Sequence, residues 1–507
     1  MSNRRVMSVS FAKTSRAVIA VGIMFCFAAP LHASEPLDVA EVQKLLDKYK
    51  VPGVSIAVIK DFKISWAKGY GVADKESGTP VTTETMFQAA SISKPVAAMA
   101  SVKAVEKGLF GLDQDVNTIL KTWKLPMDGF SKAVTPRMLM SHTSGMGDGF
   151  GFPGYGVAVG LPNYVQMMDG LPPSNRRKIR LEREPMTASE YSGGAVLMQE
   201  LALTDAVGKP FPEIMQEWVL GPLGMTNSTF AQPLPLGREA QAARAHDRNG
   251  KRSADPWHVY PEHAPAGLWT TPTDLAKFLL EVQHTLHGQG GKVIKRESLL
   301  EMVSPVGVGD FAVGFGVRRA GQGWYFGHGG SNWGFQSNMI AHFSKGYGVA
   351  VMTNGDSGGR LIQDLLNKIQ KADSWDMNDQ PPPRGYGPES VATSQSTIAK
   401  NQPSASVAGT QRTSPSPESE PMLRRRIAAL QKGEPDSQAT PEPQDKFAET
   451  SRAIQALGAL KSVTFKEINQ QGWDVFIVEF ATSRWEWAMA PLSPDGKVIG
   501  SLRRKIP

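Results

Sequence analysis

The sequence predicts a mixed α/β fold of the α+β kind: one antiparallel sheet flanked by the first and last helices, with a mostly helical subdomain inserted between its strands. Two observations predict it. Strand patterns lie near both ends of residues 34–372, whereas residues 83–300 read as helices and loops. Short consecutive strands joined by tight turns pair antiparallel, and helices must cover the faces of the resulting sheet.

The elements at the two ends follow from hydrophobic periodicity. A first helix carries apolar residues at helical spacing and ends before Pro52: Val42, Leu45, Leu46 and Tyr49. Strands are expected at residues 54–59, 64–71, 311–318, 324–327, 335–343 and 347–353. A last helix carries Ile362, Leu365, Leu366 and Ile369. A functional site is expected where the sheet meets the helical insertion.

Composition divides the 507 residues into four parts. Residues 1–33 have a basic start and an apolar run, which predicts a signal peptide and a periplasmic or secreted protein; an uncleaved membrane anchor is the alternative. Residues 34–372 form the main domain. Residues 373–421 are rich in Pro and Ser, which predicts a disordered linker or a stalk. Residues 422–507 predict two helices and four strands, a small α+β domain.

Charge and cysteine content narrow the function. The net charge of +7 falls to +3 without the four basic residues of the predicted signal segment (51 basic against 48 acidic), which is too mild to favour a nucleic-acid partner. The single cysteine, Cys26, lies in the predicted signal segment, so neither disulfides nor cysteine catalysis are expected. Glu281, His284 and His287 share a helical face but lack a fourth ligand, which favours a surface patch over a metal site. We expect no metal, no cofactor and no stable membrane span after signal cleavage.

The segment Phe87-Gln88-Ala89-Ala90-Ser91-Ile92-Ser93-Lys94-Pro95 holds the candidate nucleophile. Ser91 and Lys94 are three residues apart and share a helix face. A serine hydroxyl needs a base, and a lysine can be that base when neutral or can lower the pKa of a neighbouring base when charged. Pro95 suits an early helical turn, which would place Ser91 at a helix N-terminus. A lone Ser-x-x-Lys tetrad is weak evidence, because chance gives roughly one or two in a chain this long.

Three further segments strengthen this interpretation. Residues 190–194, Glu-Tyr-Ser-Gly-Gly, place Tyr191 in a turn, and residues 327–331, Gly-His-Gly-Gly-Ser, place His328 on a strand. Residues 139–146 contain His142, which is more consistent with support of a turn than with catalysis.

In this order, and together with Leu-Gly-Pro-Leu-Gly-Met at 220–225 and Ala-Gly-Leu-Trp-Thr-Thr-Pro-Thr-Asp-Leu at 266–275, these segments resemble class C β-lactamases and their relatives. The relatives include penicillin-binding proteins, D-alanyl-D-alanine carboxypeptidases, D-aminopeptidases and family VIII-type carboxylesterases. The resemblance covers about residues 37 to 370 and implies a β-lactamase/transpeptidase-like fold. Residues 422–507 are similar, less specifically, to small C-terminal domains of some of these proteins.

The resemblance also implies roles. Ser91 would be the acylated nucleophile, Lys94 its neighbour, and Tyr191 the general base or its assistant, with nearby cations favouring the phenolate. The backbone N–H groups of Ser91 and Ser331 would form the oxyanion hole. Gly329 and Gly330 would let the substrate lie close to the strand.

Two segments depart from the family pattern. Gly193 stands where the tyrosine segment usually ends in Asn, and His328-Gly329-Gly330 replaces Lys-Thr-Gly. Both changes weaken recognition of a substrate carboxylate, so we expect a serine hydrolase that cleaves an ester or amide of a small molecule or peptide. A β-lactamase or D-Ala-D-Ala carboxypeptidase/D-aminopeptidase, a transacylase, and a non-catalytic binding or sensor protein remain alternatives.

A basic run precedes Tyr191 and consists of Arg176, Arg177, Lys178 and Arg180. A solvated loop is the simplest interpretation of such a run. If the loop instead lies over the cleft, it can supply the anion-binding group that His328 lacks.

Overall fold

The computed structural model describes residues 36–147, 152–321, 323–379, 419–434, 444–468, 474–489 and 501–506. The predicted signal peptide, most of the predicted linker and Trp473 lie outside these residues. Within the described ranges, no helix is both long and apolar enough to cross a bilayer.

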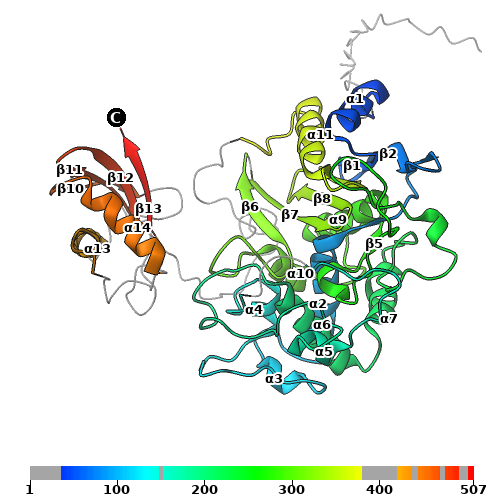
Figure 1. Cartoon of the computed structure of the whole chain (residues 1–507), viewed down its shortest axis with the longest axis horizontal. Helices are drawn as coiled ribbons and strands as arrows, with labels where there is room; N and C mark the ends of the chain where they lie inside the picture. Colours follow the sequence, from blue (N-terminus) through cyan, green and yellow to red (C-terminus); the bar gives the residue numbers. More distant parts are fainter. Residues whose placement is uncertain are drawn as a thin grey trace, which may run out of the picture.

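The main domain is organised around a seven-stranded antiparallel sheet with the order β3-β2-β1-β9-β8-β7-β6 (Figure 1). Its strands come from both ends of the domain: β1 (Gly53–Lys60), β2 (Lys63–Asp74), β3 (Thr79–Pro80), β6 (Gly316–Ala320), β7 (Gly323–Asn332), β8 (Phe335–His342) and β9 (Gly348–Thr353). β1 pairs directly with β9, from Val54 opposite Thr353 onward. This pairing confirms the predicted antiparallel sheet assembled from distant segments.

The first and last helices of the domain cover one face of the sheet. α1 (Val39–Tyr49) and α11 (Gly358–Ala372) contact each other and bury their apolar residues in a shared core with β1 and β9. Asp38 caps α1 by accepting a hydrogen bond from the Glu41 N–H at 2.9 Å. α9 (Pro272–Leu286) also packs on β1 and β9 and belongs to the larger core that includes the helical insertion.

The helical insertion surrounds α2 (Ser93–Glu106), a helix that is buried nearly all round. Its small residues let α6 (Gly193–Val207) and α8 (His263–Ala266) pack against it. The other elements are α3 (Val116–Ile119), α4 (Pro136–Met140), α5 (Tyr164–Asp169), α7 (Phe211–Met215), α10 (Arg296–Val303), the turns η1 (Ala90–Ile92), η2 (Gln216–Leu220) and η3 (Glu239–Gln241), and the short strands β4 (Phe87–Gln88) and β5 (Trp269–Thr270).

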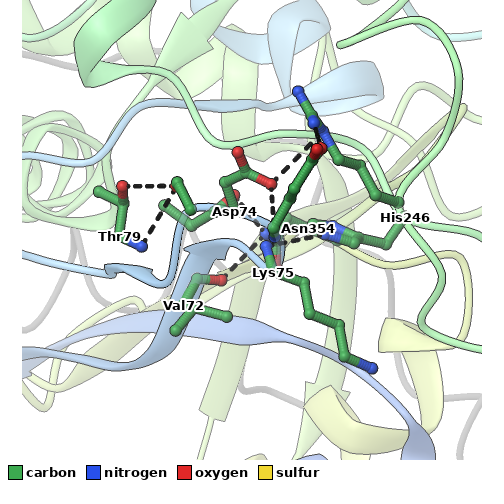
Figure 2. Close-up of polar contacts among 10 residues, drawn as sticks. Val72, Asp74, Lys75, Thr79, His246 and Asn354 are labelled. Atoms are coloured by element: carbon green, nitrogen blue, oxygen red, sulfur yellow. Dashed lines mark hydrogen bonds and ion pairs between the residues drawn. The ribbon is translucent and has the colours of Figure 1, made fainter.

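A polar cluster joins β2, the loop that contains His246 and the residue after β9, Asn354 (Figure 2). The Asn354 side chain donates to the carbonyl oxygens of Val72 and Ala73 at 3.2 and 2.9 Å, while its backbone carbonyl lies 3.0 Å from Nδ1 of His246. Ala245, beside this histidine, packs so closely that a Cβ on Gly334 would lie 2.3 Å from it. The loop that contains His246 therefore packs directly against the turn between β7 and β8.

The prediction of a strand over residues 311–318 is wrong in its first half. β6 begins only at Gly316, because Gly314 has φ +97° and the chain folds back so that Phe311 forms an isolated bridge with Gly316. The reversal frees the Phe311 side chain from the sheet and directs it to the site described below.

The boundaries of the predicted linker also differ from the structure. Ordered packing continues to Asp379: Trp375 stacks on Tyr347 at 4.7 Å, and the Asp376 carboxylate accepts hydrogen bonds from the hydroxyls of Tyr325 and Tyr347. At the other end, α13 begins at Ser419 rather than at residue 422.

The C-terminal residues form their own small core. Helices α13 (Ser419–Lys432) and α14 (Gln444–Gln455) accompany an antiparallel sheet of β10 (Leu460–Ile468), β11 (Asp474–Phe480), β12 (Arg484–Met489) and β13 (Ser501–Ile506). Its buried residues include Leu423, Phe476 and Trp487. Two helices and four strands agree with the pattern predicted for this segment.

Candidate active site

Ser91 lies in η1, the turn that leads into α2, and it is the partly exposed residue of an otherwise buried segment. The preceding Ala90 has φ +52°, a conformation that is strained for alanine. Hydrogen bonds hold it there: the Ser93 hydroxyl donates to the Ala90 carbonyl at 2.5 Å, and the Ser337 hydroxyl donates to the Ala89 carbonyl at 2.8 Å. The strained turn presents the Ser91 hydroxyl to the cleft.

Lys94 lies beside Ser91, as the sequence predicts. Its Nζ is 3.0 Å from Ser91 Oγ and 2.9 Å from the Pro265 carbonyl oxygen, and the residue is 2% exposed. A buried lysine needs such acceptors to offset its loss of hydration. The arrangement places an amine within proton-transfer distance of the candidate nucleophile.

Tyr191, in the loop before α6, completes a three-residue cluster. Its hydroxyl is hydrogen-bonded to the Ser91 side chain, and Lys94 Nζ lies 4.9 Å from the centre of its ring. Burial raises the pKa of Tyr191 above its ordinary value. The resemblance implies a phenolate favoured by nearby cations, whereas burial acts in the opposite direction and favours the neutral phenol.

His142 supports the tyrosine from behind. It has φ +60°, its Nδ1 accepts a hydrogen bond from the Ser192 N–H at 3.2 Å, and its carbonyl accepts one from the Glu190 N–H at 2.8 Å. Its ring packs on that of Tyr191, with 4.3 Å between centroids. Burial lowers the pKa of His142, so it is neutral and acts on the site by holding the tyrosine loop in place.

β7 forms the opposite wall and carries His328, Gly329, Gly330 and Ser331. His328 Nδ1 lies 2.5 Å from the Gly329 carbonyl oxygen, and Nε2 is shielded from solvent without a hydrogen-bond partner among the described residues. Burial, and secondarily the charge of Lys94, lowers the pKa of His328 to about 3. This histidine therefore supplies no cation at neutral pH.

The two glycines of this strand differ in their surroundings. A Cβ on Gly330 would lie 2.2 Å from the Ala89 carbonyl oxygen and 2.4 Å from Ser337 Oγ. A Cβ on Gly329 would meet nothing closer than 3.7 Å. Gly330 thus allows β7 to approach the nucleophile turn, whereas Gly329 faces open space.

These residues line one cleft of about 1380 Å³. Ser91, Tyr191, His328 and the adjacent β7 residues form its inner part, and Lys94 lies buried behind Ser91. The cleft is also lined by Phe152, Phe311 and the whole basic run: Arg176, Arg177, Lys178 and Arg180.

Sequence reasoning missed three contributors to the site. The Phe311 ring packs on those of Tyr191 and His328, 5.8 and 5.9 Å away. Phe152 packs beside Gly193, and the Pro265 carbonyl accepts a hydrogen bond from Lys94. The only sequence signal for these contacts was Gly193, because the absence of the usual Asn side chain leaves space for another group, here Phe152.

No group of three or more His, Cys, Asp or Glu residues suited to a metal ion occurs in the described parts of the chain. The surface-patch interpretation of residues 281–287 is wrong for Glu281, which is 5% exposed. Its carboxylate accepts hydrogen bonds from the N–H groups of Gly291 and Lys292 and thereby shapes the loop after α9.

Comparisons with known proteins agree with this geometry. A family model described as Beta-lactamase matches residues 39–372. Esterase EstB of Burkholderia gladioli is 30% identical over 219 residues, which are 42% of this chain and 54% of the esterase. Protein flp of Staphylococcus aureus is 23% identical over 350 residues, 64% of each protein. The matched segment thus spans about half to two thirds of these relatives.

Solved structures share the fold. The D-alanine carboxypeptidase AmpC from Burkholderia cenocepacia superposes with a TM-score of 0.51 and 19% identity, covering 65% of this chain and 97% of that one. The D-amino acid amidase from Ochrobactrum anthropi gives 0.51 and 21%, covering 66% and 98%. At these identities the likeness concerns the fold alone, and it confirms the predicted fold class.

Proposed function

Because the chain belongs to the beta-lactamase family, a family with esterase, carboxypeptidase and amidase neighbours, we propose that it is a serine hydrolase that cleaves an ester or amide through an acyl-enzyme on Ser91. The observation that carries the proposal is the contact of Ser91 with both Lys94 and Tyr191 at the bottom of an open cleft. A binding protein has no physical need for this cluster.

The proton path follows from the same contacts. In its neutral form, Lys94 donates to the Pro265 carbonyl and accepts the Ser91 proton as Oγ attacks the substrate carbonyl. The Tyr191 phenol, kept protonated by burial, passes a proton to the departing alcohol or amine. Water then attacks the acyl-Ser91 ester and gives its proton to the Tyr191 phenolate, while the protonated Lys94 returns its proton to Ser91 Oγ as the acid product leaves. Another acceptor in place of water would make the reaction a transacylation.

Stabilisation of the oxyanion is assigned to the backbone N–H groups of Ser91 and Ser331. β6 pairs with β7 only as far as Gly327, so no strand of the described residues covers that edge of β7 at Ser331. Close packing of Gly330 against Ala89 sets the separation of the two N–H groups.

The proposed substrate class is an ester, or an amide other than a β-lactam. Recognition of a β-lactam carboxylate by this strand would need a cation or hydroxyl at 328 and 329, where a neutral histidine and a glycine stand. The match to an esterase points the same way. A β-lactamase or D-peptidase activity and a non-catalytic binding role are the alternatives.

Covalent labelling tests the proposal. The mature protein and its Ser91→Ala variant are incubated with a fluorophosphonate probe and with a fluorescent penicillin, and adducts are located by mass spectrometry. We expect the phosphonate on Ser91 and no penicillin adduct. Labelling by both reagents would support the β-lactamase alternative, and labelling of folded protein by neither would contradict the enzyme proposal.

We also propose that the protein is exported to the periplasm or secreted, on the strength of the basic and apolar N-terminal 33 residues. Mass spectrometry of the protein from fractionated cells tests this. A mature chain that begins near Ser34 is expected, whereas an intact N-terminus on cytoplasmic protein would contradict it.

A further inference from the structure

We infer that the substrate carries a carboxylate, and that the basic run at residues 176–180, rather than β7, receives it. The inference rests on the proposed function, since it names the substrate class of the same cleft. Among the described side chains that line the cleft, four are cationic and one, Glu182, is anionic. The cations are Arg176, Arg177, Lys178 and Arg180.

The loop that carries these cations is fixed against the domain. The N–H of Ile179, a buried residue in the middle of the run, donates to the Met168 carbonyl at 2.8 Å. Asn175, immediately before the run, donates from its side chain to the Gly154 carbonyl at 2.8 Å. These contacts hold the backbone of the run in place along the cleft. A simple solvated loop would not be expected to have them.

Gly193 links this loop to the nucleophile cluster. A Cβ at Gly193 would come within 2.6 Å of the Phe152 ring, so the space left by the missing Asn side chain is filled by that phenylalanine. The guanidinium of Arg176 lies over the same ring, 4.3 Å from its centre. A group suited to bidentate contact with a carboxylate is thus held against the ring that fills the space of the family's amide.

Two cations of the run lie near carboxylates, and both of these ion pairs are long. Lys178 and Asp169 are 3.7 Å apart, and Arg180 and Glu182 are 4.0 Å apart, both with exposed cations; such pairs are weak. The carboxyl group of Glu262, which interacts with Arg176, is buried, and burial raises its pKa to about 8. It is therefore mostly protonated at pH 7.

Paired chromogenic esters test the inference. Mono-4-nitrophenyl glutarate and 4-nitrophenyl butyrate share a leaving group and differ in the acyl carboxylate. We expect the wild-type protein to prefer the glutarate ester in kcat/KM. In an Arg176→Gln/Arg177→Gln variant the preference should fall at least tenfold, mainly through KM. Arg248→Gln, which removes an exposed arginine outside the cleft, should leave the preference unchanged.

The outcomes separate the two proposals. Equal kcat/KM on both esters in the wild-type protein, or a preference that survives in the double variant, would overturn the carboxylate inference while the hydrolase proposal stands. Absence of both hydrolysis and phosphonate labelling would overturn the hydrolase proposal instead. If labelling occurs but neither ester turns over, protection of Ser91 from the probe decides: glutarate must protect better than glutaramide, and the double variant must abolish the difference.

Discussion

The inner floor of the cleft, formed by Ser91, Lys94 and Tyr191, and its basic rim, formed by residues 176–180, are built by opposite means. Lys94 and Tyr191 are held by buried contacts that fix atoms to within hydrogen-bond distance. The rim presents mostly exposed cations on a fixed backbone, with weak ion pairs. Buried packing fixes the positions of the proposed catalytic atoms, whereas the exposed cations of residues 176–180 attract a charged substrate without such fixed positioning.

Substitution of the floor residue Ser91 should cause the largest loss of activity. Ser91→Ala removes the proposed nucleophile, and we expect kcat on an ester to fall by on the order of 10³-fold or more. Unchanged thermal unfolding would show that the loss is chemical. Residual activity within tenfold of wild type would place the nucleophile elsewhere.

The two other floor residues should give smaller and non-additive losses. Lys94→Met and Tyr191→Phe are each expected to lower kcat by about 10²- to 10⁴-fold, because each removes one proton-transfer step. The double variant should be little worse than the more damaged single variant. Strictly multiplicative losses in single-turnover assays would show that the two residues act independently.

Gly330 and Gly329, neighbours in β7, provide a matched pair of variants, because the first is closely packed and the second is not. Gly330→Ala forces a methyl group onto backbone and a buried hydroxyl, so we expect about 1–3 kcal/mol of destabilisation and at least a tenfold loss of kcat/KM. Gly329→Ala should change both by far less, because its site is open. If the two variants have equal effects in denaturant titrations and in ester kinetics, the close approach of Gly330 to Ala89 has no special role.

Salt should weaken the effect of the basic rim on substrate preference without changing the chemistry at the floor. Raising the salt concentration from about 0.05 to 1 M shortens the Debye length to about 3 Å. The preference for the glutarate ester should then fall several-fold, while turnover of the neutral ester stays nearly constant. A preference insensitive to salt would locate the anion-binding group in a buried position instead of the exposed rim.

A smaller effect concerns stability at acid pH. Burial lowers the pKa of His342, the last residue of β8, to about 4, so the unfolded state binds its proton first as the pH falls below about 6.5. This histidine therefore costs stability between about pH 6.5 and 4, by up to about 1.4 kcal/mol per pH unit.

A conservative variant isolates that contribution. His342 Nδ1 accepts hydrogen bonds from the N–H groups of Ser344 and Lys345, both at 3.0 Å. Asn at this position can accept the same bonds but does not titrate. In His342→Asn, the free energy of unfolding should decline less steeply on acidification. An identical pH slope in urea titrations would assign the acid sensitivity to other groups.

The order of the terminal strands and helices along the chain, and the candidate residues Ser91, Lys94 and Tyr191, could be predicted from the sequence alone. Hydrophobic periodicity and short motifs are local properties, so they can be read without coordinates. The same holds for Gly193 and His328, whose departures from the family pattern indicated a changed substrate. The pattern did not show that His328 is neutral, because its pKa depends on burial by distant residues.

The side chains that surround those residues became known only from the three-dimensional structure. Gly314 turns Phe311 out of its predicted strand and onto Tyr191. Phe152 fills the space beside Gly193, and Arg176 lies over it. These contacts join segments far apart in the chain, and desolvation and close packing depend on such neighbours rather than on local sequence. The nucleophile was therefore readable from the sequence, whereas the charge and shape of the cleft around it were not.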